Sequence, residues 1–388
     1  MGMSARDLAP RIPPGLGITR LGDLTGLDSI GLPVWSAVRP EAWSLAQSQG
    51  KGLTVAQAQI AALMEAAETH LAENACDLIH LQGTPRAMRA QGMPVPDLAA
   101  FLRCTDPAAA EDQEFGWLEA QGIRSGTPWL VPLPLVSLDF REESAATMGP
   151  FLLASSGLAA HPDRQAALRH GLLEQIETDA YALAFAWPGI LAAAPEPDVP
   201  PDDPGIGQIA AALRAAGLGY ALRDLTSTLG VPVVLCWLVE PRGATARQSP
   251  CAGVASRPTL TEAARDAMLE AVQSRLTEIA GAREDITEAD YQSENPTVPR
   301  RHPPPGPCPS LARPLPPLPP GAEIDALLDR MATDGLGEPL VVDLSRRGDD
   351  FACVSVLCPG LETGPPAEGH RRGPRAKARL LRHALGLS

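Results

Sequence analysis

The sequence has few aromatic residues, no cluster of cysteines and no long apolar run. Aromatic residues occupy 4% of the 388 positions and hydrophobic residues 45%, so the core must be mainly aliphatic. The seven cysteines form no CxxC pair and no Cys/His group with zinc spacing, which favours reduced thiols in a cytoplasm. No segment approaches the roughly 20 apolar residues of a membrane helix, and no signal peptide is evident. We therefore expect a cytoplasmic protein that does not enter a membrane.

An excess of basic residues is also absent. The formal net charge is −14, and an acidic surface repels a phosphate backbone, so nucleic-acid binding is not expected. A polyanion such as ATP could bind only where metal ions and a few basic side chains reverse the local field.

Two segments stand apart in composition. Residues 296–321 are rich in proline, which predicts an extended surface loop rather than a helix or a central strand. Residues 370–388 form a basic C-terminal segment in an acidic chain. A solvated terminal helix explains this segment, and contact with a phosphate or with a partner's acidic face is the alternative.

Three similar segments recur along the chain. Residues 63–68, 172–177 and 268–273 each contain two apolar residues followed by Glu-x-x-Glu or Glu-x-x-Gln. Each follows a stretch rich in glycine and other small residues. Such repetition predicts three related helices in one architecture.

Strand signals accompany these helices. Residues 31–40, 230–241 and 351–359 are apolar, β-rich runs that end in proline, which predicts buried strands. Thr54 and Gln57 form a capping box, which predicts a helix over residues 55–73. We expect a mixed α+β fold, with sheets packed against the three Glu-bearing helices and without a P-loop or a Rossmann domain.

The repeated glutamates suggest a cation site. Residues three apart lie on one helix face, so Glu65 pairs with Glu68 and Glu174 with Glu177. A lone pair of this kind is usually solvated, but the recurrence beside apolar doublets favours a shared role. Helix-borne carboxylates suit Mg²⁺, which keeps several waters and bridges to phosphate.

Longer motifs extend this pattern. The sequence reads Gly-Leu-Pro-Val-Trp-Ser-Ala-Val-Arg-Pro at 31–40 and Gly-Leu-Leu-Glu-Gln-Ile-Glu-Thr-Asp-Ala at 171–180. With the motifs at 16–28, 48–66, 270–285 and 359–362, it resembles the YcaO family over nearly the whole chain. The resemblance implies a single YcaO-like domain over residues 1–388.

The resemblance also implies an activity. YcaO enzymes use ATP and Mg²⁺ to phosphorylate the oxygen of a peptide backbone amide after a nucleophile has added to its carbonyl carbon. A neighbouring Cys, Ser or Thr gives an azoline ring, and sulfide gives a thioamide. A non-catalytic accessory protein that binds nucleotide or peptide is the alternative outside enzymes.

Site residues follow from the same resemblance. Glu270, Gln273 and Arg275 are expected to face the phosphates or act in catalysis, although Arg275 could equally be an ordinary salt-bridged arginine. Lys51, between two glycines, is a candidate phosphate ligand. The residues expected to bind Mg²⁺ and ATP are Glu65, Glu68, Glu174 and Glu177.

The sequence departs from the family pattern at Ala61, Thr69, Ser156 and Thr178, where the family more often has serine, arginine, asparagine and arginine. The final residues, 384–388, lack the Pro-x-Pro-x-Pro tail of many azoline-forming members. This difference resembles members that work with a TfuA-type partner. We therefore expect a thioamide-forming enzyme with a peptide or protein substrate, a TfuA-type partner and a sulfur donor. Homodimerisation is expected by resemblance alone.

Overall fold

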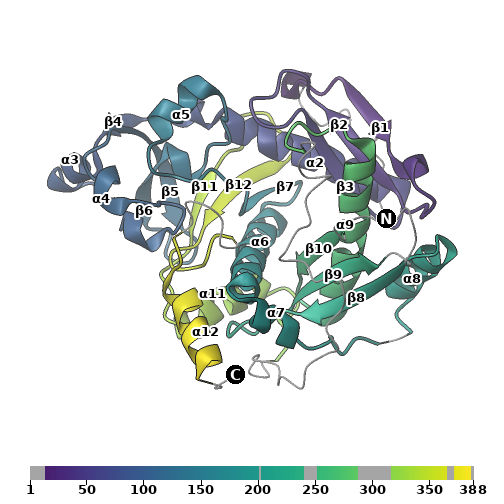
Figure 1. The fold of residues 1–388 in the computed structure, drawn as a ribbon. Coiled ribbons are helices and arrows are strands. Elements are labelled where there is room, and N and C mark those ends of the chain that lie inside the picture. Colours follow the sequence, from purple (N-terminus) through teal and green to yellow (C-terminus); the bar gives the residue numbers. More distant parts are fainter. Residues whose placement is uncertain (1–13, 201, 240–250, 287–315, 365–370, 386–388) are drawn as a thin grey trace.

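The computed structural model describes residues 14–200, 202–239, 251–286, 316–364 and 371–385. Three antiparallel sheets surround a central helix, α6 (Arg164–Phe185), as Figure 1 shows. The mixed α+β fold predicted from the sequence is confirmed. The proline-rich segment lies outside the described residues, apart from its last few positions.

The sheets have the following order and bounds. The first is β1 (Arg20–Asp23), β2 (Val34–Val38) and β3 (Gln47–Lys51). The second is β10 (Ala252–Ser256), β9 (Val233–Val239) and β8 (Gly219–Asp224). The third is β4 (Leu81–Gly83), β5 (Phe115–Gly122), β11 (Leu340–Asp343), β12 (Ala352–Leu357) and β7 (Leu158–His161), with β6 (Pro128–Pro132) paired to β5.

Each sheet supplies one edge strand that leads directly into a long helix. Strand β3 precedes α2 (Val55–Glu73), β7 precedes α6, and β10 precedes α9 (Leu260–Ala280). The three predicted Glu-bearing helices are these three, and the predicted buried strands are β2, β9 and β12. The molecule thus contains three strand–helix units, each at the edge of its own sheet.

Local sequence explains where these helices begin. Thr54 caps α2 with the predicted capping box, and helix 55–73 has the predicted bounds. Thr259 caps α9 in the same way with Glu262, and Asp163 caps α6 by accepting two backbone N–H bonds. All three starts are therefore encoded by side chains one residue before the helix.

Small residues let the strands lie directly on the helices. A Cβ atom at Gly50 in β3 would lie 2.1 Å from the carbonyl oxygen of Ala58 in α2. A Cβ atom at Gly253 in β10 would lie 2.3 Å from the backbone nitrogen of Ala271 in α9. These two glycines are therefore required by close packing, and they bring polar backbone atoms of the strands beside the Glu-bearing helix faces.

The remaining helices cover the outside of the molecule. Helix α12 (Pro374–Ala384) packs near α6 at the C-terminal end, as Figure 1 shows, so the predicted basic terminal segment does contain a helix. Within the described residues, no helix is long and apolar enough to cross a membrane. The other helices are α3 (Pro85–Ala90), α4 (Pro107–Ala110), α5 (Glu142–Met148), α7 (Pro188–Ala193), α8 (Pro204–Ala215) and α11 (Glu323–Thr333).

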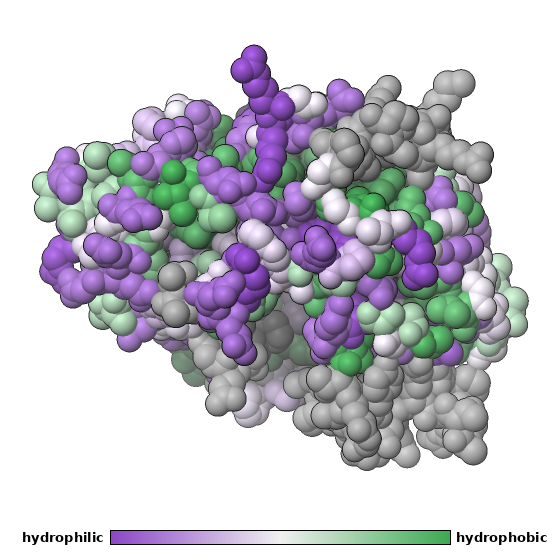
Figure 2. Space-filling view, turned by 90° about the horizontal axis from the view of Figure 1, so that it is seen from above, coloured by the Kyte–Doolittle hydropathy of each residue, from purple (hydrophilic) through white to green (hydrophobic). Residues whose placement is uncertain are grey.

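Figure 2 views the molecule from above. Polar residues cover much of that face, with apolar patches between them, and the face is hollowed near its middle.

Candidate active site

The three strand–helix units match in register. Counted from the helix caps Thr54, Asp163 and Thr259, a glutamate stands eleven residues later in every unit. The residue fourteen positions after the cap is Glu68, Glu177 or Gln273. The repetition noted in the sequence is therefore a repetition in structure.

The first glutamate of each unit accepts a hydrogen bond from its own edge strand or from the residue just before it. The donor is a backbone N–H that the sheet leaves free, because β3, β7 and β10 are edge strands. All three nitrogen–oxygen distances are 3.3 Å. The pairs are Gln49 with Glu65, Gly157 with Glu174, and Val254 with Glu270.

The second residue of each unit reaches the edge strand of the next unit. Glu68 of α2 accepts a 2.6 Å bond from the Ala160 N–H in β7. Glu177 of α6 accepts a 2.8 Å bond from the Ser256 N–H in β10. The Gln273 amide of α9 donates a 3.3 Å bond to the Gln49 carbonyl in β3, which closes the circle. We call this arrangement the carboxylate ring; its members are Glu65, Glu68, Glu174, Glu177, Glu270 and Gln273.

The ring gathers carboxyl groups away from bulk water, which disfavours their charged form. Burial raises the pKa of Glu65 to about 7 and that of Glu68 to about 8, against an ordinary value of 4.5. The pKa of Glu174 and of Glu177 is raised well above that value, by burial first and then by neighbouring carboxylates. The protein itself therefore supplies too little positive charge to keep all four carboxyl groups ionised.

Three basic side chains partly offset this charge. Lys51 Nζ lies 2.8 Å from Glu270 Oε2. Arg257 lies near Glu177 and Glu270 but is paired with Asp266 at 2.6 Å. Arg283 lies near Glu65 and is paired with its neighbour in sequence, Asp285.

Sequence reasoning singled out Lys51 and missed the two arginines as site residues. Their positions in the sequence could have indicated them, because Arg257 directly follows β10 and Arg283 follows the end of α9.

Arg275 lies elsewhere. Its guanidinium group is ion-paired with Asp28, which follows the short helix at Thr25–Leu27. The structure thus brings together seven of the eight residues expected from the sequence and leaves Arg275 in an ion pair outside the ring. This pairing corresponds to the salt-bridged alternative for that residue.

The ring fits Mg²⁺ with phosphate better than Mg²⁺ alone. Among the described residues, no three His, Cys, Asp or Glu side chains stand close enough together to hold a metal ion. Mg²⁺ does not require such a cage, because it is usually bound by one or two carboxylates together with water and substrate phosphates. Oxygen ligands with raised pKa values, distributed over neighbouring helices, are suited to that mode of binding.

Comparison with known proteins identifies the family. Residues 49–362 match the YcaO family, described as YcaO cyclodehydratase, ATP- and Mg²⁺-binding. The chain belongs to the YcaO family. The family prediction and the expectation of ATP and Mg²⁺ are confirmed at this level.

Two uncharacterized proteins match the chain in sequence. An uncharacterized protein from the tfuA 3′ region of Rhizobium leguminosarum bv. trifolii is 36% identical over 71% of this chain and 66% of its own length. An uncharacterized protein of Methanothermobacter thermautotrophicus is 32% identical over 71% of this chain and 70% of its own length. The chain thus matches about two thirds of the length of these two relatives.

Solved YcaO structures share the architecture. YcaO from Methanopyrus kandleri bound with AMPPCP and Mg²⁺ has a TM-score of 0.68 at 22% identity, covering 92% of this chain and 90% of that one. A heterocyclase in complex with substrate and cofactor has a TM-score of 0.70 at 18% identity, covering 93% of this chain and 53% of that one. At these identities the likeness establishes the fold.

The departures from the YcaO pattern make contacts of their own. Thr178 Oγ1 lies 3.3 Å from Ser156 Oγ, so two of the departures touch each other. Thr69 Oγ1 accepts a 2.7 Å bond from Arg39 Nη1, and Arg39 also forms a buried ion pair with Glu73. Both threonines, which follow Glu68 and Glu177 in sequence, therefore have hydrogen-bond partners.

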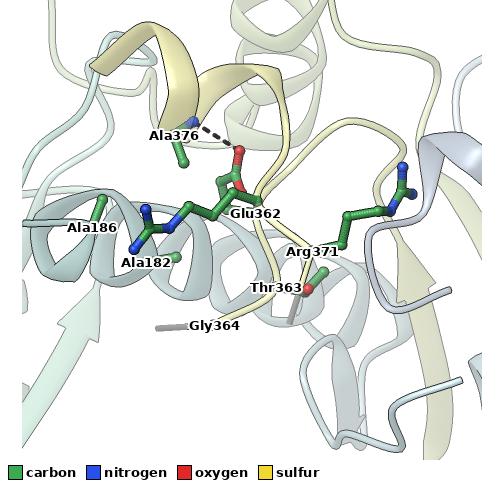
Figure 3. A pocket seen from close by; sticks show the side chains of 8 residues that line it. Ala182, Ala186, Glu362, Thr363, Gly364, Arg371 and Ala376 are labelled. Carbon is green, nitrogen blue, oxygen red and sulfur yellow. Dashed lines mark hydrogen bonds between the residues drawn. The ribbon is translucent and has the colours of Figure 1, made fainter. Parts of the chain in front are cut away.

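A second polar cluster joins α6 to the C-terminal helix. Asp179 is fully buried and takes two bonds from Arg375 of α12, at 2.9 and 3.0 Å. Glu362 caps α12 by accepting bonds from the backbone nitrogens of Gly373 and Ala376. Figure 3 shows the bond to Ala376, beside a small pocket that Arg371 also lines. This cluster holds the helix and does not face the carboxylate ring.

Proposed function

We propose that this protein activates a peptide backbone amide by O-phosphorylation with Mg²⁺ and ATP, and that the product is a thioamide. The observation that carries the proposal is the carboxylate ring, in which half-buried glutamates from two units lack matching cations of their own. A polyanionic nucleotide with divalent cations would supply that charge.

The residues of the ring take separate roles in this proposal. Bound Mg²⁺ would neutralise the triphosphate and polarise the phosphoryl group that is transferred. Lys51 and Arg257 stand where they could meet phosphate oxygens, while Glu270 and Gln273 belong to the third helix that completes the site. Arg275 would act on the phosphates only if its ion pair with Asp28 opened. The residues that would hold the metal ions are Glu65, Glu68, Glu174 and Glu177.

The same activation of the amide leads to either product. A nucleophile adds to the amide carbon, the resulting oxyanion takes the terminal phosphoryl group of ATP, and phosphate then leaves with the former amide oxygen. With sulfide as nucleophile, carbon keeps sulfur and a thioamide results. With a neighbouring Cys, Ser or Thr side chain, the ring closes with net loss of water and an azoline results.

One finding favours the thioamide. The name of the Rhizobium relative places that protein in the tfuA 3′ region, which supports a TfuA-type partner for this chain. A separate sulfur donor is required by the thioamide reaction itself. The azoline reaction remains the second candidate because the fold is shared with a heterocyclase. A peptide or protein substrate follows from either reaction.

Two further parts of the proposal concern the cellular compartment and the assembly of the protein. The six cysteines in the described regions are free thiols, which is in keeping with a reducing cytoplasm. Assembly as a homodimer is retained as a prediction from family resemblance, and a non-catalytic accessory role is the rival to any enzymatic function.

Calorimetry of Mg²⁺·ATP binding tests the site. Glu65→Gln/Glu68→Gln and Glu174→Gln/Glu177→Gln each remove one carboxylate pair while keeping side-chain shape. We expect wild type to bind and each double variant to lose at least about 100-fold in affinity, because loss of a group that only supports a metal ligand already costs about 10–100-fold. Glu111→Gln/Asp112→Asn, outside the ring, is the matched control and should bind normally. Equal binding by all four proteins would refute the assignment.

Substrate-dependent phosphate release then separates an enzyme from an accessory protein. The mass of the modified peptide distinguishes the reactions, because exchange of oxygen for sulfur increases the mass and loss of water decreases it. A folded protein that binds Mg²⁺·ATP but releases no phosphate with peptide, partner and sulfide present would favour the accessory role.

A further inference from the structure

Helix α12 turns an apolar face outward. Residues at steps of four, three and four positions form one line along it, which we call the α12 seam: Pro374, Ala378, Leu381 and Leu385. All four are exposed. Leu381 and Leu385, each 61% exposed, are the most exposed large hydrophobic side chains among the described residues. Leu385 follows the last residue of the helix, and its N–H still bonds to the Leu381 carbonyl oxygen, so the seam continues to this residue.

The other faces of α12 hold it in one orientation. Near its start, Ala376 is buried and Arg375 is ion-paired with Asp179 of α6. Near its end, a Cβ atom at Gly189 in α7 would lie 2.9 Å from His383 Nε2, so His383 lies directly against α7. The helix is thus anchored at both ends, at the edge of the molecule in Figure 1, and the seam faces away from these anchors.

Basic residues border the seam. At 3.6 residues per turn, Lys377 lies on one side of the line of apolar residues and Arg382 on the other. Both are exposed, and neither forms an ion pair within the described part of the chain. The whole protein has a net charge of −14, so this basic and apolar surface contrasts with the rest of the chain. It is complementary to an apolar line that acidic residues border.

We propose that the α12 seam, with Lys377 and Arg382, is the docking surface for an acidic amphipathic helix of a partner protein. Leucines one turn apart fit between the side chains of a second helix. Acidic residues beside the apolar line of that helix would meet Lys377 and Arg382. The inference goes beyond the proposed reaction, because the surface lies outside the carboxylate ring and binding there needs neither ATP nor turnover.

Two other occupants match the surface less well. A second copy of α12 would bring the same two basic residues against Lys377 and Arg382, and like charges across such a seam oppose pairing. An anionic membrane would face a whole side of a protein with net charge −14. A partner helix meets mainly the charges within about 8 Å, one Debye length at physiological salt. The local charge of α12 therefore favours an acidic helix.

Fluorescence anisotropy with labelled helical peptides tests the proposal on the full chain. The probe is a designed peptide with leucines one turn apart and glutamates beside them, and a second peptide has lysines in place of the glutamates. The proteins compared are wild type, Leu381→Ser/Leu385→Ser and Lys377→Glu/Arg382→Glu. Leu27→Ser/Leu81→Ser, which changes two exposed leucines elsewhere, is the matched control. Thermal unfolding shows that each variant is folded.

We expect wild type and the control to bind the glutamate peptide at least about tenfold more tightly than the lysine peptide, because only the first has the complementary charge. Leu381→Ser/Leu385→Ser should lose about tenfold or more in affinity, the scale of loss when anchor residues of an interface are removed. The charge-reversed variant, Lys377→Glu/Arg382→Glu, should instead prefer the lysine peptide.

Equal binding of both peptides by wild type, or unchanged affinity in a folded Leu381→Ser/Leu385→Ser variant, would overturn the proposal. Binding of phosphatidylserine vesicles without binding of the glutamate peptide would assign the seam to a membrane. A wild-type dimer that the leucine substitutions dissociate and the glutamate peptide does not would assign it to a second copy. Either result would overturn the proposal as well. Failure of wild type to release phosphate with a peptide substrate would count against the proposed function alone, since peptide docking is measured without ATP.

Discussion

Two neighbouring carboxylates on α6, Glu177 and Asp179, differ in their partners. Asp179 is fully buried, and burial raises its pKa, but Arg375 and the backbone N–H of Glu362 satisfy both of its oxygens. Glu177 is half-buried, accepts one backbone bond and faces other carboxylates, which raises its pKa well above the ordinary value after the effect of burial. Asp179 has an ion-pair partner and supports the fold. Among the described residues, Glu177 has only the nearby Arg257, which is paired with Asp266, so it can take a cation from outside.

Breaking the Asp179 pair should have the largest effect on stability. Asp179→Ala leaves the largely buried Arg375 with Asp334 as its only ion-pair partner among the described residues, so we expect a loss of about 3 kcal/mol of unfolding free energy, the lower end of the range for a broken buried pair. Urea unfolding measures the effect. The double variant Asp179→Leu/Arg375→Leu should recover much of that loss, because no charge then remains buried unpaired.

Glu177→Gln is the matched comparison on the same helix. It should leave the unfolding free energy of the metal-free protein unchanged or higher, because it removes a carboxylate from a repulsive cluster. If Glu177→Gln destabilised the protein as much as Asp179→Ala, the contrast between the two regions would not hold.

The pH dependence of stability should report the burial of the ring carboxylates. The pKa of Glu68 is about 8 in the fold against an ordinary 4.5, so its folded form resists ionisation. Below about pH 4.5 the group is protonated in both states and imposes no penalty. As the pH rises from there toward 8 the unfolded chain loses its proton first, and the metal-free protein becomes less stable.

Thermal unfolding of wild type and Glu68→Gln across pH 5–9 measures this effect. We expect wild type to lose stability relative to the variant as the pH rises, and Mg²⁺ with ATP to reduce the difference. Glu111→Gln, which removes a partly exposed carboxylate outside the ring, controls for general charge effects. A difference between wild type and Glu68→Gln that stays constant with pH would contradict the predicted environment.

Much of the fold followed from the sequence because its signals were local. The capping box at Thr54 fixed the start of α2, and the apolar runs that end in proline marked β2, β9 and β12. The pairing of those strands into three separate sheets could not be predicted, because it depends on contacts between residues far apart in the chain. The closed ring was hidden for the same reason: it joins Gln273 to Gln49 across most of the sequence.

The sequence predicted the carboxylates of the site well and its basic residues less well. Recurrence identified the glutamates, since three helices carry them at the same distance from the cap. No repeat marks Arg257 and Arg283, and the helix position of Arg275 gave no sign that Asp28 would pair with it. Basic residues have long side chains and find their partners in three dimensions, so spacing along the chain predicts them poorly.

Thr178, between Glu177 and Asp179 in sequence, should show the smallest effect. Its hydroxyl lies 3.3 Å from that of Ser156 and also donates to the Glu174 carbonyl within the helix, so it neither binds a cation nor satisfies a buried charge. Thr178→Val keeps the shape and removes the hydroxyl, which costs about 0.5–1.5 kcal/mol for a neutral hydrogen bond. Mg²⁺·ATP affinity measured by calorimetry should remain within about threefold of wild type, a change of about 0.65 kcal/mol, since neither hydroxyl contact involves the side chain of a ring member. A much larger loss of affinity in a folded variant would mean that Thr178 itself contributes to the nucleotide site. The comparison on α6 would then place Thr178 with Glu177 at the nucleotide site, apart from Asp179.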